Sequence, residues 1–384
     1  MSPSALDVLR SLHHGARRAG LPPPAALIGS WLDADAVIAP SLELVAGLAP
    51  PDDPDRFWLG HLGFPVGVDD SPFPAVAGGL TDAVLLLRDG RWSYVSVTGA
   101  ARPDWVAEAL QTAAAPGPVV ARWHPPTRER HDAHRAAVAS ALEAIAAGEI
   151  YQVCICTRLD GRLDGAPLDF FGMVAAATAP VKSAFLQGDW GTLASFSPES
   201  FLRRRGSAVT SSPIKGTIPA DADPRDLAMS VKDVAENVMI VDLVRNDLGR
   251  VARIGTVTVP ELLTVVGAPG VWHLVSTVRA ELDDEVGNDA LLDATFPPAS
   301  VTGTPKIRAA ELIGQWETLP RGVYCGAIGL AGPDHALDLS VAIRTVEIDP
   351  DGAMRLGVGG GITVDSDPSR EWQECLDKAA AIVR

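Results

Sequence analysis

Three strand-like segments near the end of the sequence are joined by turns so short that only antiparallel neighbours can follow. Residues 322–330, 337–348 and 353–358 form these segments, and Gly-Pro-Asp and Asp-Pro-Asp-Gly sequences separate them. Glycine, proline and aspartate are typical of tight turns, whereas a parallel crossover needs about a dozen residues or more. The sequence therefore predicts antiparallel sheet in this region.

Helical segments are indicated elsewhere in the chain. Residues 131–147 are alanine-rich, carry apolar residues at helical spacing and stop at Gly148, a typical C-terminal signal; residues 149–159 then resemble a strand. Residues 83–87 and 92–97 are typical of a β-hairpin. The predicted fold class is therefore α+β with antiparallel sheet.

The composition disfavours several classes of function. The chain has 384 residues, 47% of them hydrophobic, yet no apolar run reaches the length of about 18–20 residues that a membrane span needs. The N-terminus lacks a secretory signal, and four cysteines without a C-x-x-C motif argue against a disulfide framework or a zinc site. A net charge of −16 disfavours nucleic acid, and it reflects either solubility or metal-binding carboxylates. We expect a cytoplasmic protein that binds neither nucleic acid nor membrane.

Two predicted helices carry paired carboxylates. In residues 230–248 the buried stripe is predicted to consist of four valines at helical spacing, Val231, Val234, Val238 and Val241. Asp233 and Glu236 are neighbours at i, i+3 and are predicted to face away from that stripe.

The last helix is predicted to begin at Pro368, after the capping candidates Ser366 and Asp367. Its predicted buried stripe consists of Trp372, Leu376, Ala379 and Val383. A different face carries Glu371, Glu374 and Lys378. Carboxylate pairs on two separate helices suit a hard cation such as Mg²⁺, whereas a solvated face with i, i+4 pairing is the alternative for each helix alone.

Two segments suit an anionic small molecule. Gly359, Gly360 and Gly361 directly follow a predicted strand, where backbone N–H groups can approach a carboxylate, and a flexible turn is the alternative. Thr304 is the expected N-cap and Pro305 the first residue of a helix. The N-terminus of that helix either holds an anion or merely starts the helix.

His273 and Arg344 are candidates for contacts with substrate oxygens. His273 lies in an apolar run, where it either donates to a ligand or is a satisfied core residue. Arg344 ends the alternating run 339–344 and is predicted to lie opposite the apolar side chains of that strand. There it either clamps a carboxylate in bidentate fashion or lies on the surface.

Lys215 stands out because this chain almost never uses lysine. Of 32 basic residues five are lysines, which leaves 32 − 5 = 27 arginines. A primary amine, unlike a guanidinium, can lose its proton in a desolvated site and attack carbon. The residue therefore suggests covalent chemistry.

A series of ordered motifs from residue 148 onward resembles the chorismate-utilising enzymes, a family with the first components of anthranilate and aminodeoxychorismate synthases and with isochorismate and salicylate synthases. The matching motifs are GEIYQV (148–153), SPESF (197–201), SPIKGT (212–217), KDVAEN (232–237), IVDLVRNDLG (240–249), HLVST (273–277), SVTGTPK (300–306), IRT (343–345), GGGI (359–362) and EWQE (371–374) with Lys378. The resemblance implies an anthranilate synthase component I-like fold, in which large antiparallel sheets pack as a sandwich with flanking helices. Residues 1–120 are expected to contribute to that sandwich, and residues 121–384 to form the chorismate-binding catalytic region.

Residues at two positions distinguish the reactions that members of this family catalyse. Enzymes that add water to chorismate have a lysine base where this chain has Gln152, which disfavours isochorismate and salicylate formation. Anthranilate synthases typically have alanine where this chain has Lys215, whereas aminodeoxychorismate synthases have lysine. The resemblance is therefore closest to aminodeoxychorismate synthase component I, an enzyme that converts chorismate and ammonia into 4-amino-4-deoxychorismate for 4-aminobenzoate in folate or secondary metabolism.

The resemblance also implies roles for residues of this sequence. Lys215 would form a covalent adduct with the substrate, and Glu199 would be the general acid. Mg²⁺ would be held by Glu236 and Glu374, with Asp233 and Glu371 in support. The substrate would lie among Gly216, Thr217, His273, Thr302, Arg344, Gly359, Gly360, Gly361 and Lys378.

Ammonia needs a source. The chain has no Gly-x-Cys-x-Gly glutaminase motif, so the resemblance implies a separate glutamine amidotransferase subunit. Anthranilate synthase component I and 2-amino-2-deoxyisochorismate synthase are the alternative enzymes, and an inactive glutaminase-binding relative is the non-enzyme alternative. The presence of the acid, the lysine and the metal carboxylates argues against the last.

Overall fold

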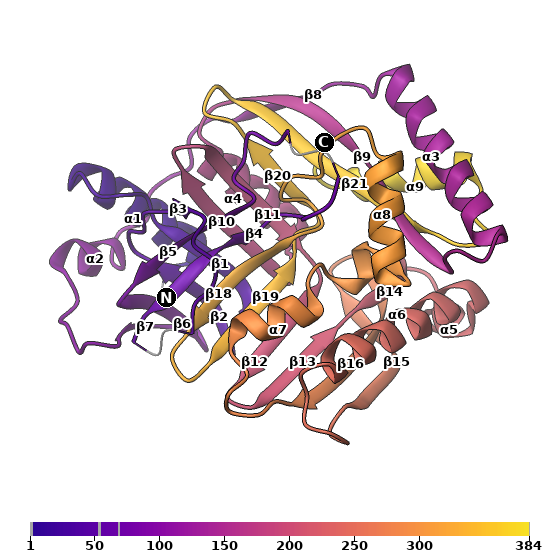
Figure 1. Cartoon of the computed structure of the whole chain (residues 1–384). Helices are drawn as coiled ribbons and strands as arrows, with labels where there is room; N and C mark the ends of the chain where they lie inside the picture. The colour runs from indigo at the N-terminus through magenta and orange to yellow at the C-terminus, as the bar shows by residue number, and fades with distance from the viewer. Residues whose placement is uncertain (1–2, 53–54, 68–69, 384) are drawn as a thin grey trace.

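The computed structural model describes residues 3–52, 55–67 and 70–383, which form two large antiparallel sheets with helices around them (Figure 1). The predicted α+β class is therefore confirmed. The helices are α1 (Ala5–Arg18), α2 (Asp104–Ala109), α3 (Arg128–Ala146), α4 (Pro167–Thr178), α5 (Pro224–Met229), α6 (Val231–Gly249), α7 (Asn288–Thr295), the 3-10 turn η1 (Ala299–Val301), α8 (Lys306–Trp316) and α9 (Pro368–Ala379).

The first sheet, sheet A, has eleven strands, and β8 pairs with β9 beside the main order. In spatial order the others are β17 (Gly303–Thr304), β9 (Gln152–Asp164), β21 (Ala353–Ile362), β20 (Thr345–Ile348), β11 (Gly191–Ser197), β10 (Lys182–Gly188), β1 (Ala25–Trp31), β2 (Ala34–Ala39), β6 (Ala83–Arg88) and β7 (Arg91–Ser96). β8 spans Val120–Trp123. All pairings in this sheet are antiparallel within the described ranges.

The second sheet, sheet B, has ten strands, and β15 (Thr258–Ala268) pairs with β16 beside the main order. The others follow as β14 (Ile214–Pro219), β16 (Val271–Glu281), β13 (Ala208–Ser212), β12 (Ser200–Arg205), β19 (Ala336–Val341), β18 (Ala327–Gly332), β4 (Phe57–Leu62), β5 (Val76–Thr81) and β3 (Val45–Ala46). Strands from the first 120 residues extend both sheets at the ends away from β14 and β17, on the left of Figure 1.

The short turns near the C-terminus join antiparallel strands, as the sequence predicts. β18 pairs with β19 and β20 pairs with β21. The single strand expected over residues 337–348 is wrong, however, because β19 belongs to sheet B and β20 to sheet A. Arg344 lies between them with φ of 51°. This left-handed conformation cannot continue a strand, so the chain leaves one sheet there and enters the other.

Helix α6 connects the two sheets at the end that carries β14 and β17. It packs against β14 and β16 of sheet B and against β17 of sheet A. Val241, Val244 and Leu248 of this helix are buried in the same apolar cluster as Val153 and Ile155 of β9. No helix of the described residues combines the length and the hydropathy that crossing a bilayer requires.

Candidate active site

Lys215 lies on β14, at the edge of sheet B. The pairing of β14 with β16 shifts register at Lys215 and Gly216, which form a bulge that re-aims the lysine side chain. Gly216 has φ of 86°, and a Cβ there would lie 2.9 Å from the Cβ of Asp233, so only glycine fits. The ammonium of Lys215 donates to the carbonyl oxygen of Ser300 at 2.9 Å.

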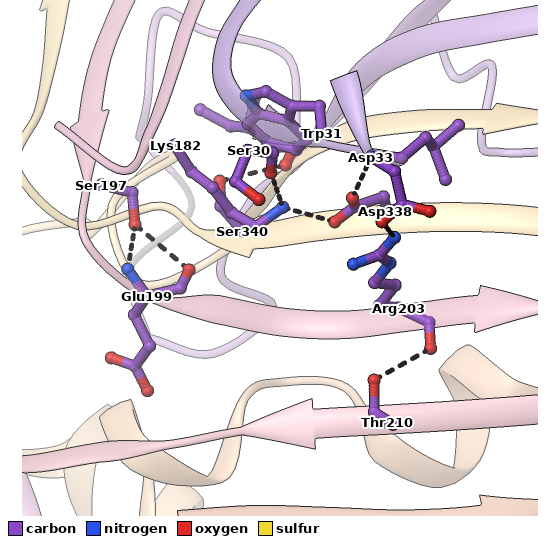
Figure 2. Close-up of polar contacts among 12 residues, drawn as sticks. Ser30, Trp31, Asp33, Lys182, Ser197, Glu199, Arg203, Thr210, Asp338 and Ser340 are labelled. Carbon is purple, nitrogen blue, oxygen red and sulfur yellow. Dashed lines mark hydrogen bonds and ion pairs between the residues drawn. The ribbon is translucent and has the colours of Figure 1, made fainter. Parts of the chain in front are cut away.

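Glu199 lies between β11 and β12, within the electrostatic influence of Lys215, with only 4% of its surface exposed. Its backbone N–H donates to Ser197 Oγ at 3.2 Å (Figure 2). Burial raises the pKa of the Glu199 carboxyl, and a hydrogen bond from the Ser300 side chain and the charge of Lys215 oppose that rise. A carboxyl group in such surroundings can hold a proton for transfer.

His273 and Arg344 lie close to each other and to the acid. His273 on β16 pairs with Thr217 on β14, and its Nδ1 is 2.8 Å from the Thr217 hydroxyl. Burial, with a smaller effect from Arg344, lowers the pKa of His273 to about 4, so the imidazole is neutral at neutral pH. Within the described part of the chain the half-buried guanidinium of Arg344 has no hydrogen bond or ion pair. A carboxylate of a ligand would satisfy it.

The structure contradicts the predicted buried stripe of α6. Val231 is 86% exposed and Val238 is also exposed, whereas Glu236 is only 7% exposed. The helix turns another face inward, which includes Glu236, Asn237, Ile240, Val241, Val244, Asp247 and Leu248. The reason is tertiary: Asn237 donates to the carbonyl of Leu274 and accepts from Ser276 Oγ at 2.5 Å, which anchors this face to β16. Glu236 therefore points into the molecule.

The predicted buried stripe of α9 is also largely wrong. Asp367 caps the helix before Pro368 as expected, but of the predicted stripe only Ala379 is fully buried, while Trp372, Leu376 and Val383 are half-buried. Glu371 is instead only 3% exposed, and Cys375 is buried with it. The cause lies in β21, where glycines let the Glu371 face of the helix approach closely.

The three glycines lie within β21 rather than after a strand, which corrects their predicted place. A Cβ on Gly360 would lie 3.1 Å from Glu371 Oε2 and 3.7 Å from Glu374 Oε1. A Cβ on Gly361 would lie 3.5 Å from Glu236 Oε2. The glycine strand thus leaves room beside carboxylates of both acidic helices, which the sequence could not bring together.

These carboxylates have the right chemistry for Mg²⁺. Glu371 Oε2 is buried without a hydrogen-bond partner, and its Oε1 accepts from Ser366 Oγ at 2.6 Å. Among the described residues no three Asp, Glu, His or Cys side chains form a complete ligand group. Mg²⁺ commonly takes only one or two carboxylates and completes its shell with water and substrate oxygens, so one carboxylate from each helix, such as Glu236 and Glu374, could hold this ion.

Ammonium groups lie among the same carboxylates. Lys232 Nζ is 3.9 Å from Glu236 and 3.7 Å from Glu371. Lys378 is 2.8 Å from Glu374 and donates to the carbonyl oxygen of Gly359 at 2.9 Å. Lys232 was not among the site residues predicted from the sequence, and neither was Ser300. Their positions inside matching motifs were the available signal.

The predicted helix start, with Thr304 as N-cap and Pro305 as the first helical residue, is wrong by one residue. Helix α8 begins at Lys306 after Pro305, and no side chain caps it. Lys306 donates to Asp247 at 2.6 Å and to two backbone carbonyls, so it anchors the helix to α6. The hydroxyl of Thr302 is buried and donates to the carbonyl of Pro298 at 2.8 Å.

A family model described as chorismate binding enzyme matches residues 90–384. The chain belongs to the chorismate binding enzyme family. The resemblance found in the sequence motifs is thereby confirmed.

Two solved structures share the fold of this chorismate binding enzyme. Anthranilate synthase component I from Streptococcus pneumoniae has a TM-score of 0.71 at 25% identity and covers 88% of this chain and 83% of its own. The menaquinone-specific isochorismate synthase from Escherichia coli has a TM-score of 0.73 at 19% identity, with 100% and 92% covered.

Some relatives of this chorismate binding enzyme are named aminodeoxychorismate synthase, and others are named anthranilate synthase. Aminodeoxychorismate synthase component 1 of Escherichia coli is 41% identical over 63% of this chain and 55% of its own length. Aminodeoxychorismate synthase of Streptomyces pristinaespiralis is 36% identical, with 84% of this chain and 49% of its own length covered. Anthranilate synthase component 1 of Streptomyces coelicolor is 40% identical, with 64% and 50% covered. The chain spans about half the length of these relatives.

Proposed function

We propose that this chorismate binding enzyme converts chorismate and ammonia into 4-amino-4-deoxychorismate and water. The observation that carries the proposal is the amine of Lys215, held 2.9 Å from the Ser300 carbonyl beside the buried acid Glu199. A nucleophile and a proton donor thus act on each other electrostatically in one site, which suits displacement of a hydroxyl group. The similarity to proteins named aminodeoxychorismate synthase supports the same choice.

The reaction consists of two displacements, and every bond and proton is accounted for in each. Glu199 gives its proton to the C4 hydroxyl, which leaves as water, while the unprotonated amine of Lys215 forms a bond to C2 and returns a proton to Glu199. Ammonia then forms a bond to C4 and the bond between Lys215 and C2 breaks. The proton from the incoming nitrogen passes to the departing lysine amine. Because lysine occupies C2, ammonia is directed to C4 and not to C2.

Other residues of the site would hold the substrate. The guanidinium of Arg344 would pair with one carboxylate, and the neutral His273 with Thr217 would donate to oxygens nearby. Gly216, Lys378 and the backbone of Gly359, Gly360 and Gly361 would line the remaining surface, whereas Thr302 is fully buried and would support that surface from behind. Mg²⁺ on Glu236 and Glu374, supported by Asp233 and Glu371, would neutralise the ring carboxylate when bound.

Ammonia would come from a partner. The relatives' name, component 1, implies a second component, and we assign that role to a glutamine amidotransferase subunit in the cytoplasm. The purified chain should therefore use ammonium salts but not glutamine. Adding the amidotransferase should make glutamine a nitrogen source.

The test is to incubate the purified chain with chorismate, Mg²⁺ and ammonium salt. The product is identified by mass and by conversion with a lyase into 4-aminobenzoate. We expect 4-amino-4-deoxychorismate, and no product in the matched reaction that contains EDTA. Anthranilate, 2-amino-2-deoxyisochorismate or salicylate as the sole product would contradict the proposal.

A further inference from the structure

Arg321 and Glu317 form an ion pair in the interior and are not among the residues assigned to the substrate. The pair lies between α8 and β18, and its side chains are only 2% and 5% exposed. The guanidinium donates to both carboxylate oxygens of Glu317, at 2.8 and 2.7 Å. Its face lies over the ring of Phe64, with 4.3 Å between the guanidinium carbon and the ring centroid.

The remaining hydrogen bonds of this pair reach two different segments. Arg321 donates to the carbonyl oxygen of Val301 in η1 and to that of Cys154 in β9, each at 2.8 Å. Glu317 Oε1 accepts from the backbone N–H of Cys156 in β9 at 2.9 Å. The pair therefore holds η1 against the N-terminal part of β9.

The segment η1 touches both proposed catalytic groups. Ser300, the residue before Val301, accepts from the amine of Lys215 through its carbonyl, and its side chain lowers the pKa of the Glu199 carboxyl. A shift of η1 would therefore move the acceptor of the nucleophile and the donor to the acid together. Replacing a buried ion pair with apolar residues is often neutral for stability, so this pair needs another reason to be charged.

We propose that Arg321, held by Glu317, is a positioning residue that sets the place of Ser300 and through it the geometry of Lys215 and Glu199. The inference rests on the proposed function. The planar guanidinium donates at once to the Glu317 carboxylate and to two backbone carbonyl oxygens, those of Val301 and Cys154. The ammonium of a lysine, on its flexible side chain, cannot match this fixed geometry. A displacement of about 1 Å at reacting groups can cost about 10²-fold in rate.

The proposal has a consequence for pH dependence. Glu199 must be protonated to act as an acid, so activity falls as the pH rises through its pKa. Burial raises that pKa, whereas the Ser300 side chain, Lys215, the Ile214 N–H and Arg344 oppose the rise. If η1 moves, the Ser300 bond weakens and the basic limb of the rate profile shifts to higher pH.

The test compares two buried ion pairs that are changed in the same way. Arg321→Met/Glu317→Gln removes the clamp but keeps an amide oxygen for the Cys156 N–H. Lys182→Met/Asp338→Asn is the control, because it neutralises a pair of similar burial and keeps an oxygen for the Leu32 N–H. Arg321→Lys is a third variant that keeps the positive charge and loses the planar set of guanidinium N–H donors. Thermal unfolding, kcat, the chorismate KM and the pH profile of kcat are measured for each.

We expect the clamp variant to lower kcat by about 10²-fold, with the chorismate KM changed by less than about threefold and the basic limb moved upward. Arg321→Lys should show the same pattern to a smaller extent, and the control should keep the wild-type kcat and profile. A clamp variant that keeps the wild-type kcat and the wild-type pH profile of kcat overturns the inference. So does a result in which both double variants lose kcat in proportion to their loss of Tm. If the wild type makes another chorismate product, the proposed function fails, and the same comparison on that product still tests the positioning.

Discussion

Two regions of the molecule bury charged groups in opposite ways. Between the sheets, the ammonium of Lys182 on β10 donates to Asp338 Oδ1 at 2.6 Å and to the Ser30 carbonyl at 2.8 Å, and it lies 4.0 Å from the centre of the Trp31 ring (Figure 2). The second oxygen of Asp338 accepts from the Leu32 N–H at 2.9 Å. Both charged groups of this ion pair therefore have their partners.

The candidate active site has buried polar groups that lack them. Glu371 Oε2 and Gln152 Oε1 are buried without a hydrogen-bond partner, and Arg344 has no ion pair among the described residues. Buried polar atoms are normally satisfied, and an exception needs a reason. The ion pair between the sheets is satisfied within the protein, whereas groups of the candidate active site are left with capacity to bind a ligand.

The largest expected effect belongs to Lys215. Lys215→Ala removes the proposed nucleophile, and formation of 4-amino-4-deoxychorismate should fall by at least about 10⁴-fold. The lyase-coupled assay measures the loss, and equilibrium binding of chorismate should change little. Unchanged turnover would remove the lysine from the mechanism.

Glu199→Gln should have the next largest effect on catalysis. The amide keeps the shape of the side chain but has no acidic proton, so kcat should fall by about 10²–10⁴-fold. In the wild type the raised pKa of Glu199 keeps the acid protonated to higher pH, and activity should decline as the pH rises through that pKa. A variant with the same basic limb as the wild type would show that another group is the acid.

Lys182→Met should affect stability and not chemistry. It leaves Asp338 buried with no ammonium partner, so the free energy of unfolding should fall by about 3–5 kcal/mol. Denaturant unfolding measures this change, and kcat of the folded fraction should stay at the wild-type level. A large loss of kcat without loss of stability would reverse the roles of the two regions.

Glu236→Gln should weaken Mg²⁺ binding by about 10–100-fold. Calorimetric titration with Mg²⁺ measures the affinity directly. Asp242→Asn is the matched control on the same helix, because Asp242 is exposed and pairs with Arg245. Equal Mg²⁺ affinity in both variants would exclude Glu236 as a ligand.

The smallest effect is expected at the tip of the β1–β2 hairpin. Asp33, which is mostly exposed, pairs with Arg203 and Arg205, and Asp33→Asn should cost only about 0.2–1 kcal/mol. Its bond with Arg203, against an opposing effect of burial, lowers the pKa of Asp33 below its ordinary value. The contribution is therefore present at neutral pH and is lost as the pH falls through that lowered pKa. A difference in unfolding free energy that persists below this pH would contradict the assignment.

Much of the fold and part of the site were predictable from local patterns. The short turns predicted antiparallel pairing, and Ser230 to Leu248 predicted α6 within one residue at its C-terminal end. The buried faces of α6 and α9 were not predictable in this way. Spacing reports the average hydropathy of a face, whereas burial of Glu236 and Glu371 depends on β16 and on the glycines of β21.

Local patterns in the sequence were enough to predict the antiparallel class, the family and Lys215 as a candidate nucleophile, because turn lengths and motifs are local. Only the tertiary structure decided that carboxylates of α6 and α9 lie on one glycine strand, that residues 337–348 split between two sheets, and that Arg321 clamps η1. Each of these outcomes depends on contacts between segments far apart in the chain. Such contacts decide which polar groups are buried and which remain unsatisfied, and no local spacing records them.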